Sequence, residues 1–125
     1  MARPSISLVI AAYNEAATLE PVYRRCMSML EECCDDFEVV ILDDASTDET
    51  GEIAARLAAE SPGVVRVLTH SRNQGIAITF EELNRAATRE WIFDIPADGE
   101  YPPEALRRIV PLLGEFDIVV CNRTF

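Results

Sequence analysis

The residues with the clearest chemical potential are carboxylates in short polar segments that follow apolar runs. The segment DGE carries Asp98 and Glu100 on either side of Gly99, so two hard oxygen donors stand on one tight turn. Such oxygens suit Mg²⁺ or Mn²⁺, which keep open positions for the phosphates of a substrate. A turn of this composition is also common without a ligand, so the pair indicates a metal site only in combination with other segments.

A second acidic segment, DDASTDET, begins with Asp43 and Asp44. Asp44 stands just past an apolar run, where its carboxylate could accept a hydrogen bond from the N–H of uracil or guanine and so select the base. The rest of the segment has a simpler explanation, because Ser46 and Glu49 have the spacing of a capping box at a helix start. Capping explains the serine but not the two preceding aspartates.

The segment AAYNEA adds an aromatic ring and another carboxylate. The ring of Tyr13 could stack on a nucleobase, and Glu15 could accept a hydrogen bond from a ribose or a base. The alternative is that Asn14 caps the first helix while Glu15 favours its dipole, and the residues alone leave both open.

The segment HSRNQG places Asn73 and Gly75 before a predicted helix, whose first amides could face an anion. His70 in the same segment is assigned no role, because a single histidine is more often structural than catalytic.

Each of these segments follows a predicted strand. Short apolar runs rich in Val and Ile alternate with helix-length segments, and their near-continuous hydrophobicity predicts burial on both faces. The alternation indicates βαβ units, hence an α/β fold with a mostly parallel sheet and helices on both faces. We predict strands at 7–12, 38–42, 64–68, 91–95 and 117–121, and helices at 15–33, 49–60, 75–88 and 103–113.

The polar segments should converge, because ligands of open parallel sheets bind outside the carboxyl ends of the strands, near the point where strand order reverses. AAYNEA lacks the glycines with which a backbone approaches a dinucleotide pyrophosphate, so a dehydrogenase site is not expected. A sugar nucleotidyltransferase is disfavoured for the same reason, since its glycine-rich loop is missing.

The amino-acid composition further narrows the classes of protein and of ligand that the sequence allows. The chain has 125 residues, 49% of them hydrophobic, which suits one domain over 1–125. Its net charge of −11 and scattered arginines argue against nucleic acid as a partner, and the absence of lysine excludes P-loop and Schiff-base lysines. An acidic protein that binds a phosphorylated ligand needs another cation, which points to a metal.

The four cysteines lack the spacing of a metal site. The sequence shows no signal-peptide pattern and no apolar run long enough to span a membrane, so the expected location is cytoplasmic.

Taken together, the polar segments resemble the family 2 glycosyltransferases in order and spacing from Ser5 to Phe125. The stretches that carry the resemblance are VIAAYNEAATL, VVILDDASTDETGEIA, SRNQG, IPADGEYPPEAL and FDIVVCNRTF. The arrangement is similar to polyprenyl-phosphate sugar transferases of the dolichyl-phosphate mannose synthase type. The resemblance implies a Rossmann-like GT-A fold, of which 1–125 would be the nucleotide-sugar-binding part, truncated after the fifth strand and lacking the acceptor part.

The resemblance also implies roles for single residues. Asp44 matches a base-reading aspartate, Asp98 matches the last aspartate of a DxD motif, and Asn73 and Gly75 would lie near the diphosphate. The metal ligands would be Asp98 and Glu100. The donor-binding set would be Ala12, Tyr13, Glu15, Asp44, Ser46, Asn73, Gly75, Ala97, Asp98 and Arg123.

One departure from the family pattern concerns the metal. Pro96 stands where many relatives carry the first aspartate of DxD, which predicts reduced metal affinity. Asp94 is not expected to substitute, because it keeps the register of the strand.

The implied activity is the transfer of a sugar from a UDP- or GDP-sugar to an acceptor, with inversion and with Mg²⁺ or Mn²⁺ on the diphosphate. Polyprenyl phosphate is one possible acceptor, which would place the full-length protein at the cytoplasmic membrane face if it carries a C-terminal membrane segment.

The chain stops before the expected general-base carboxylate, so catalytic residues stay unassigned, and the chain is expected to bind donor without transferring sugar. The exposed surface of a truncated sheet predicts self-association. The alternative function is a non-catalytic nucleotide-binding or interaction module on the same fold.

Overall fold

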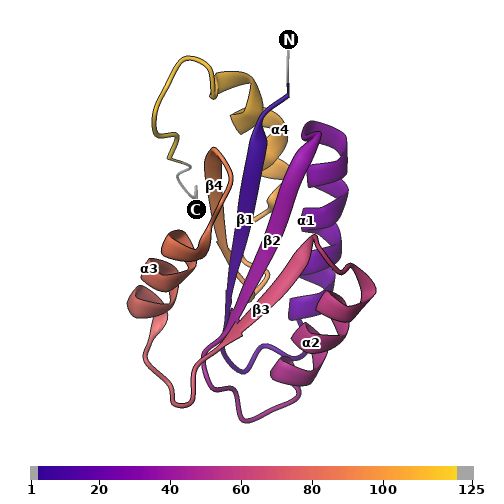
Figure 1. Ribbon diagram of the computed structural model, residues 1–125, viewed down its shortest axis with the longest axis vertical. Helices are drawn as coiled ribbons and strands as arrows, with labels where there is room; N and C mark the ends of the chain where they lie inside the picture. The colour runs from indigo at the N-terminus through magenta and orange to yellow at the C-terminus, as the bar shows by residue number, and fades with distance from the viewer. Residues whose placement is uncertain (1–2, 121–125) are drawn as a thin grey trace.

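The computed structural model describes residues 3–120 and contains one four-stranded sheet. Its strands are β1 (Ser5–Ala12), β2 (Asp36–Asp43), β3 (Val65–Thr69) and β4 (Trp91–Pro96). The strand order is β3-β2-β1-β4, and every neighbouring pair is parallel (Figure 1). The predicted α/β fold with a parallel sheet is therefore confirmed.

The helices occupy the predicted segments with shifted ends. They are α1 (Leu19–Cys33), α2 (Thr50–Glu60), α3 (Ile76–Ala86) and α4 (Leu106–Ile109). The first helix begins four residues later than predicted, because a turn forms first, in which the amide of Leu19 donates to the carbonyl of Glu15 at 2.9 Å. The last predicted helix consists of the short α4 between two 3₁₀ turns, Pro103–Ala105 and Val110–Leu112.

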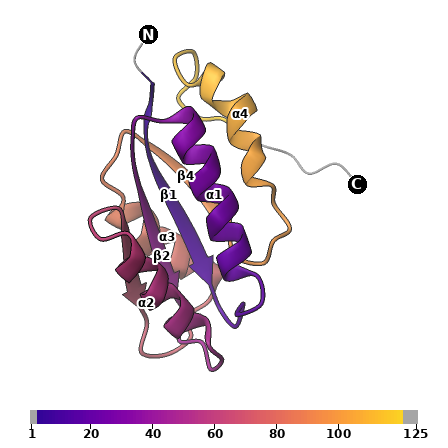
Figure 2. The same cartoon turned by 90° about the vertical axis from the view of Figure 1, so that its right-hand side faces the viewer.

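Helices cover both faces of the sheet, as predicted. The helices α1, α2 and α4 lie on one face and α3 on the other (Figures 1 and 2). Alternate residues of β1 supply the two cores, since successive strand side chains point to opposite faces. Ile6, Leu8 and Ile10 belong to the larger core, which includes side chains of α1 and α2, whereas Val9 and Ala11 pack in the smaller core with Leu83 of α3.

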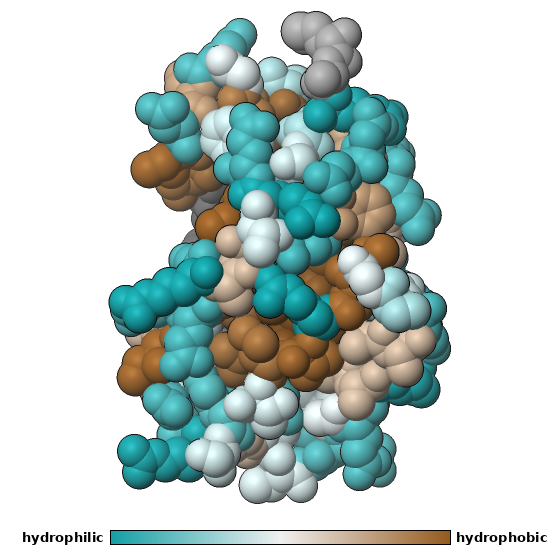
Figure 3. Space-filling model, in the orientation of Figure 1, coloured by the Kyte–Doolittle hydropathy of each residue, from teal (hydrophilic) through white to brown (hydrophobic). Residues whose placement is uncertain are grey.

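Burial on both faces holds only for the central strands β1 and β2. In β3, Arg66 is exposed, and in β4 both Ile92 and Asp94 are exposed. The reason is position, because β3 and β4 are the edges of the sheet and α3 alone covers one face. Figure 3 has the orientation of Figure 1, in which the strands lie partly uncovered. It shows apolar residues at the surface in the middle of the face turned to the viewer. The expectation of continuous burial was therefore wrong for the edge strands.

The predicted fifth strand is also wrong over the residues that the structure describes. Residues 117–120 form no strand, and Ile118 and Val120 are 79% and 76% exposed. They line a groove of about 1100 Å³ beside β4, together with Ile92 and Phe93. An apolar run becomes a strand only when its backbone groups pair in a ladder, and here they do not pair with β4. Between residues 3 and 120, no helix has both the length and the apolar content needed to cross a bilayer.

Candidate functional site

A pocket of about 360 Å³ opens at the carboxyl ends of β1 and β4. The chain adds β2 and β3 on one side of β1 and then β4 on the other, so strand order reverses between β1 and β4. Ligands of open α/β sheets are expected at this point. The lining residues are Ala11, Ala12, Tyr13, Glu15, Asp44, Asn73, Gly75, Ile76, Thr79, Pro96, Ala97 and Asp98.

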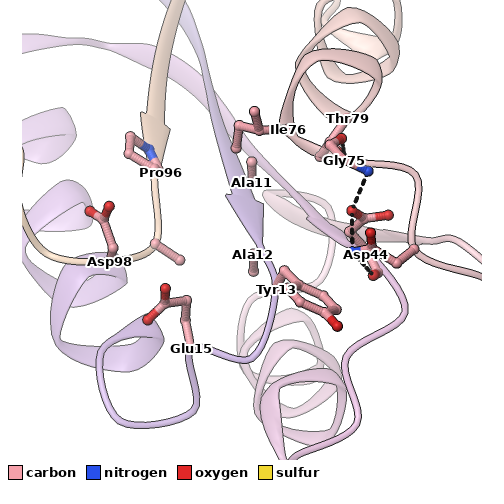
Figure 4. Close-up of a pocket in the computed structure, with 12 residues that line it drawn as sticks. Ala11, Ala12, Tyr13, Glu15, Asp44, Gly75, Ile76, Thr79, Pro96 and Asp98 are labelled. Atoms are coloured by element: carbon pink, nitrogen blue, oxygen red, sulfur yellow. Dashed lines mark hydrogen bonds between the residues drawn. The ribbon is translucent and has the colours of Figure 1, made fainter.

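Most residues of the predicted donor-binding set therefore meet in one place, although they come from four loops. Tyr13, Asp44 and Asp98 share the pocket, each from a different loop (Figure 4). Ser46 does not line it, and Glu100 lines the groove beside β4 instead. Arg123 lies outside the described residues. The convergence agrees with the prediction that polar segments meet at the carboxyl ends of the strands.

The ends of β1 and β4 form the back of the pocket with small side chains. The amide of Ala97 donates to the carbonyl of Ala11 at 3.0 Å, which continues the pairing of the two strands to the pocket. The following turn needs Gly99, whose φ of +80° is strained for any L side chain. In that turn the amide of Glu100 donates to the Asp98 carboxylate at 2.9 Å. Asp98 is thereby fixed at the pocket entrance.

The loops after β1 and β2 are joined by side-chain hydrogen bonds to backbone. The amide of Asn14 donates to Ser46 Oγ at 2.9 Å, and Asn14 Oδ1 accepts from the amide of Thr47 at 2.8 Å. Asn14 has φ of 51°, a left-handed conformation that asparagine tolerates. Asn14 therefore ties the loops together and does not cap α1. Ser46 serves the same link, so neither the capping box nor a direct contact with the pocket is observed.

The N-cap of α2 is Glu49, whose side chain makes no capping hydrogen bond, and Asp48 just before it binds the start of the helix instead. Its Oδ1 accepts the amide of Thr50 at 2.9 Å, and its Oδ2 accepts the amide of Ala16 at 3.2 Å. The hydroxyl of Thr50 in turn accepts the amide of Glu15 at 2.9 Å. The start of α2 thus holds the loop after β1, which carries Tyr13 and Glu15 into the pocket.

Two carboxylates lie on one side of the pocket, those of Glu15 and Asp98 (Figure 4). Thr18 connects their loops, since its hydroxyl donates to the Ala97 carbonyl at 2.6 Å and lies 3.1 Å from Glu15 Oε2. Asp94 is exposed on β4 and does not line this pocket, but it lines the groove beside β4 together with Asp98 and Glu100. That it does not replace the carboxylate missing at Pro96 stays a prediction.

The carboxylate of Asp44 lies on the other side and is 3% exposed (Figure 4). Its Oδ2 accepts Asn73 Nδ2 and the amide of Gly75, both at 2.9 Å, and its Oδ1 accepts the amide of Gln74 at 2.8 Å. Oδ1 also lies 2.7 Å from Nδ1 of His70. Four partners occupy the roughly four lone-pair positions of a carboxylate. Burial alone would raise the pKa of Asp44, but the hydrogen bonds from His70, Gln74 and Gly75 outweigh it and lower the pKa.

His70 was not assigned a role from the sequence, yet it contacts Asp44, which lines the pocket. It is 8% exposed, and its Nε2 lies 2.6 Å from Glu82 Oε2 of α3. Hydrogen bonds to Asp44 and then to Glu82 raise the pKa of His70 above its ordinary value. No local signal could have identified these partners, because Asp44 and Glu82 belong to other elements.

Among the residues that the structure describes, the pocket lining carries the carboxylates of Glu15, Asp44 and Asp98 and includes no arginine, lysine or histidine. Within residues 3–120, no group of three or more His, Cys, Asp and Glu side chains is arranged to hold a metal ion. Asp98 with one neighbouring carboxylate fits an ion of the Mg²⁺ type, which uses one or two protein carboxylates and completes its shell with substrate phosphate and water.

Residues 7–125 match the family model of Glycosyl transferase family 2. The chain belongs to this family. It is 34% identical over 119 residues to undecaprenyl-phosphate 4-deoxy-4-formamido-L-arabinose transferase of Pseudomonas syringae pv. syringae, covering 91% of this chain and 34% of that protein. It is 33% identical over 122 residues to a PGL/p-HBAD biosynthesis glycosyltransferase of Mycobacterium bovis, covering 94% and 44%. The chain thus spans between a third and a half of these relatives.

Solved structures of glycosyltransferases share the fold. The mannosyltransferase PcManGT from Pyrobaculum calidifontis, in complex with GDP-Man and Mn²⁺, aligns with a TM-score of 0.73 at 26% identity, over 88% of this chain and 32% of its own. TarS 1–349 of S. aureus, in complex with UDP-GlcNAc, aligns with a TM-score of 0.72 at 20% identity, over 89% and 31%. The fold is GT-A, as the resemblance implied.

Proposed function

We propose that the pocket binds a nucleoside-diphosphate sugar as the donor of a metal-assisted, inverting sugar transfer. The observation that carries the proposal is the convergence of Tyr13, Asp44 and Asp98, from three loops, on one pocket where the strand order reverses. Family membership and the nucleotide-sugar complexes of two structural neighbours support it.

The nucleoside would occupy the side of the pocket formed by Tyr13 and Asp44. Tyr13 is 44% exposed, and its ring could stack on a base. A base N–H can reach the Asp44 carboxylate only by displacing one of its four donors, and the side chain of exposed Asn73 is the one best able to move. The amide of Gly75 is already used by Asp44, so Asn73 and Gly75 border the nucleoside in this proposal, not the diphosphate as first expected.

The diphosphate would lie on the side of Asp98. Because the described lining residues provide no positive charge, two phosphates next to Glu15 and Asp98 need a counter-cation. Asp98 would hold Mg²⁺ or Mn²⁺, with Glu100 or Glu15 as the second carboxylate. When bound, the ion would neutralise the charge that develops on the leaving diphosphate. Asp98 and the turn at Gly99 would keep the donor oriented.

We propose the acceptor and the location of the full-length protein from the names of its relatives. One relative is named for undecaprenyl phosphate, which supports a polyprenyl-phosphate acceptor reached at the cytoplasmic membrane face. The general base for the acceptor hydroxyl is not assigned to any residue of this chain.

Isothermal titration of the chain with UDP and with GDP, each with and without Mn²⁺, tests the proposed donor site. We expect binding of one nucleotide that is at least about tenfold stronger with Mn²⁺. Absence of binding by both nucleotides at millimolar concentration, to protein shown to be folded by circular dichroism, would overturn the site.

A second candidate, a non-catalytic nucleotide-binding module, is favoured by Pro96 at the position of the missing carboxylate. The variant Asp98→Ala separates the two functions, with Glu81→Ala, an exposed carboxylate of α3 that lines neither the pocket nor the groove, as the control. Loss of the Mn²⁺-dependent part of the affinity in Asp98→Ala alone supports the metal role. Affinity that is independent of Mn²⁺ and unchanged in both variants supports the module.

We also propose that the chain self-associates through the edge of β4 with which no further strand pairs within residues 3–120. Ile92 on this edge is 46% exposed, and unpaired edge strands with apolar side chains favour pairing with another chain. Sedimentation velocity over a range of concentrations should show dimers that Ile92→Lys weakens, and a concentration-independent monomer contradicts the proposal.

A further inference from the structure

His70 is the single histidine of the chain and has an acidic partner on each ring nitrogen. Nδ1 lies 2.7 Å from Asp44, which follows β2, and Nε2 lies 2.6 Å from Glu82 on α3. A neutral imidazole has one N–H and can donate to only one carboxylate, whereas the imidazolium donates to both. The geometry therefore fits the protonated ring, which bridges the end of the sheet and α3.

The bridge continues into the pocket through Asp44. The same carboxylate holds the amides of Gln74 and Gly75 and the side chain of Asn73. Asn73 and Gly75 line the pocket. The first turn of α3 starts directly after Gly75 (Figure 4). A proton on His70 thus fixes the carboxylate that fixes this wall of the pocket.

We propose that His70 is a positioning residue for the donor nucleotide, because its imidazolium, held between Asp44 and Glu82, keeps the loop 73–75 and the start of α3 in the binding-competent arrangement. This inference rests on the proposed function. His70 itself touches no pocket surface, since it is absent from the lining residues and acts through Asp44.

The charged groups that face His70 from the described elements packed against it are Asp44 and Glu82, and both favour the imidazolium. Arg72, on the same loop, is exposed. When the ring loses its proton, one carboxylate loses its donor and no positive charge separates Asp44 from Glu82. The contact that orients the Asp44 carboxylate then weakens and the loop 73–75 is held less firmly, so nucleotide affinity should fall as the pH rises through the pKa of His70. By thermodynamic reciprocity, bound nucleotide should raise that pKa.

Proton NMR can follow the ring of this one histidine without ambiguity. The experiment titrates the chain between about pH 5.5 and about pH 9, free and saturated with UDP or GDP and Mg²⁺. We expect a pKa above the ordinary value of 6.5. It should be lower in Glu82→Gln and higher when nucleotide is bound. The Glu82 side chain is 44% exposed, so this variant is expected to fold even if His70→Gln does not.

Nucleotide affinity provides the second measurement over the same pH range. We expect wild-type affinity to fall by about fivefold or more across the titration, His70→Gln to bind weakly at every pH, and Glu82→Gln to weaken at lower pH than wild type. The control Glu81→Gln changes an exposed neighbour on α3 that pairs with Arg85, and it should behave as wild type.

The outcomes distinguish the two proposals. A wild-type His70 that titrates at or below its ordinary value overturns the imidazolium bridge. Nucleotide binding with a pH profile that is the same in wild type and in Glu82→Gln overturns the positioning role and leaves the proposed function intact. Failure of wild type to bind either nucleotide overturns both.

Discussion

Two buried carboxylates at opposite ends of β2 show how similar local chemistry serves different purposes. Glu38, near the start of the strand, is 5% exposed and accepts Ser7 Oγ at 2.6 Å and both the amide and hydroxyl of Thr88 at 2.8 Å. Arg66 supplies a further contact at 3.3 Å. Asp44, just past the end of β2, is equally buried and equally surrounded by donors.

The difference lies in what the partners do. Those of Glu38 join β1, β3 and the loop before β4 at the amino ends of the strands, away from the pocket. Two of those of Asp44, Asn73 and Gly75, line the pocket itself. A buried carboxylate whose acceptor positions are all used in hydrogen bonds is therefore not evidence for or against function. Its position relative to the carboxyl ends of the strands decides which role it has.

The largest expected effect is on stability at Glu38. Replacing it by Ala leaves the buried Ser7 hydroxyl without its acceptor, removes the shorter of the two hydrogen bonds of the Thr88 amide and takes the carboxylate partner from Arg66, which should cost about 3 kcal/mol. Urea unfolding would measure this loss, with Glu81→Ala as the exposed control. Nucleotide affinity of the folded variant should equal that of wild type, and a weaker affinity would contradict the separation of the two carboxylates.

The variant Asp44→Asn should lower both the stability and the nucleotide affinity of the chain. The amide group turns one acceptor into a donor that faces existing donors, which should cost about 2 kcal/mol of stability. We expect nucleotide affinity to fall by about tenfold or more, since the wall at 73–75 is released. Isothermal titration calorimetry of Asp44→Asn and Glu38→Ala under the same conditions compares their nucleotide affinities directly. Full affinity in Asp44→Asn would assign Asp44 to architecture alone.

The pH dependence of stability should show contributions from Glu38 and from His70. Burial would raise the pKa of Glu38, but hydrogen bonds from Ser7 and Thr88 and the charge of Arg66 lower it to about 2. Its stabilisation is thus complete above its ordinary pKa of 4.5 and is lost as the pH falls toward about 2. His70, with a raised pKa, stabilises fully below 6.5 and loses this contribution as the pH rises through its folded pKa. Urea unfolding should therefore show highest stability between about 4.5 and about 6.5.

Variants assign the two limbs of this profile. Glu38→Ala should flatten the acid limb, and Glu82→Gln should move the alkaline limb to lower pH. An alkaline limb unchanged in Glu82→Gln would show that His70 does not cause it.

A smaller loss is expected where the first two loops meet. Asp48→Ala removes the acceptor for the amides of Thr50 and Ala16 and should cost about 1 kcal/mol, the usual value of a helix cap. Thermal unfolding would measure it. If nucleotide affinity also falls, the links between these loops position Tyr13 as well as stabilising the fold.

The smallest effect is expected at Ala45, which follows Asp44 with φ of 59°. Glycine adopts this conformation without strain but gains freedom in the unfolded chain, so Ala45→Gly should change stability by less than about 1 kcal/mol, in the stabilising direction. A clear fall in melting temperature would show that the methyl group makes contacts that outweigh the strain.

The sequence was sufficient for the features that depend on local pattern and on general rules of parallel sheets. Apolar runs such as those of β1 and β2 located the strands, and the polar residues after them, including Tyr13, Asp44 and Asp98, were correctly expected to converge. The same rule identified the four loops that form the pocket, because the carboxyl ends of parallel strands meet at one edge.

Only the tertiary structure decided which groups pair. The run at 117–120 has the composition of a strand but makes no ladder with β4, and Ser46 holds the backbone of Asn14 in place of the predicted cap. His70 meets Asp44 and Glu82, which are 26 and 12 residues away in the chain. Hydrophobic periodicity determines which faces are buried, whereas a hydrogen-bond partner depends on how distant segments are brought together, and that information is not local.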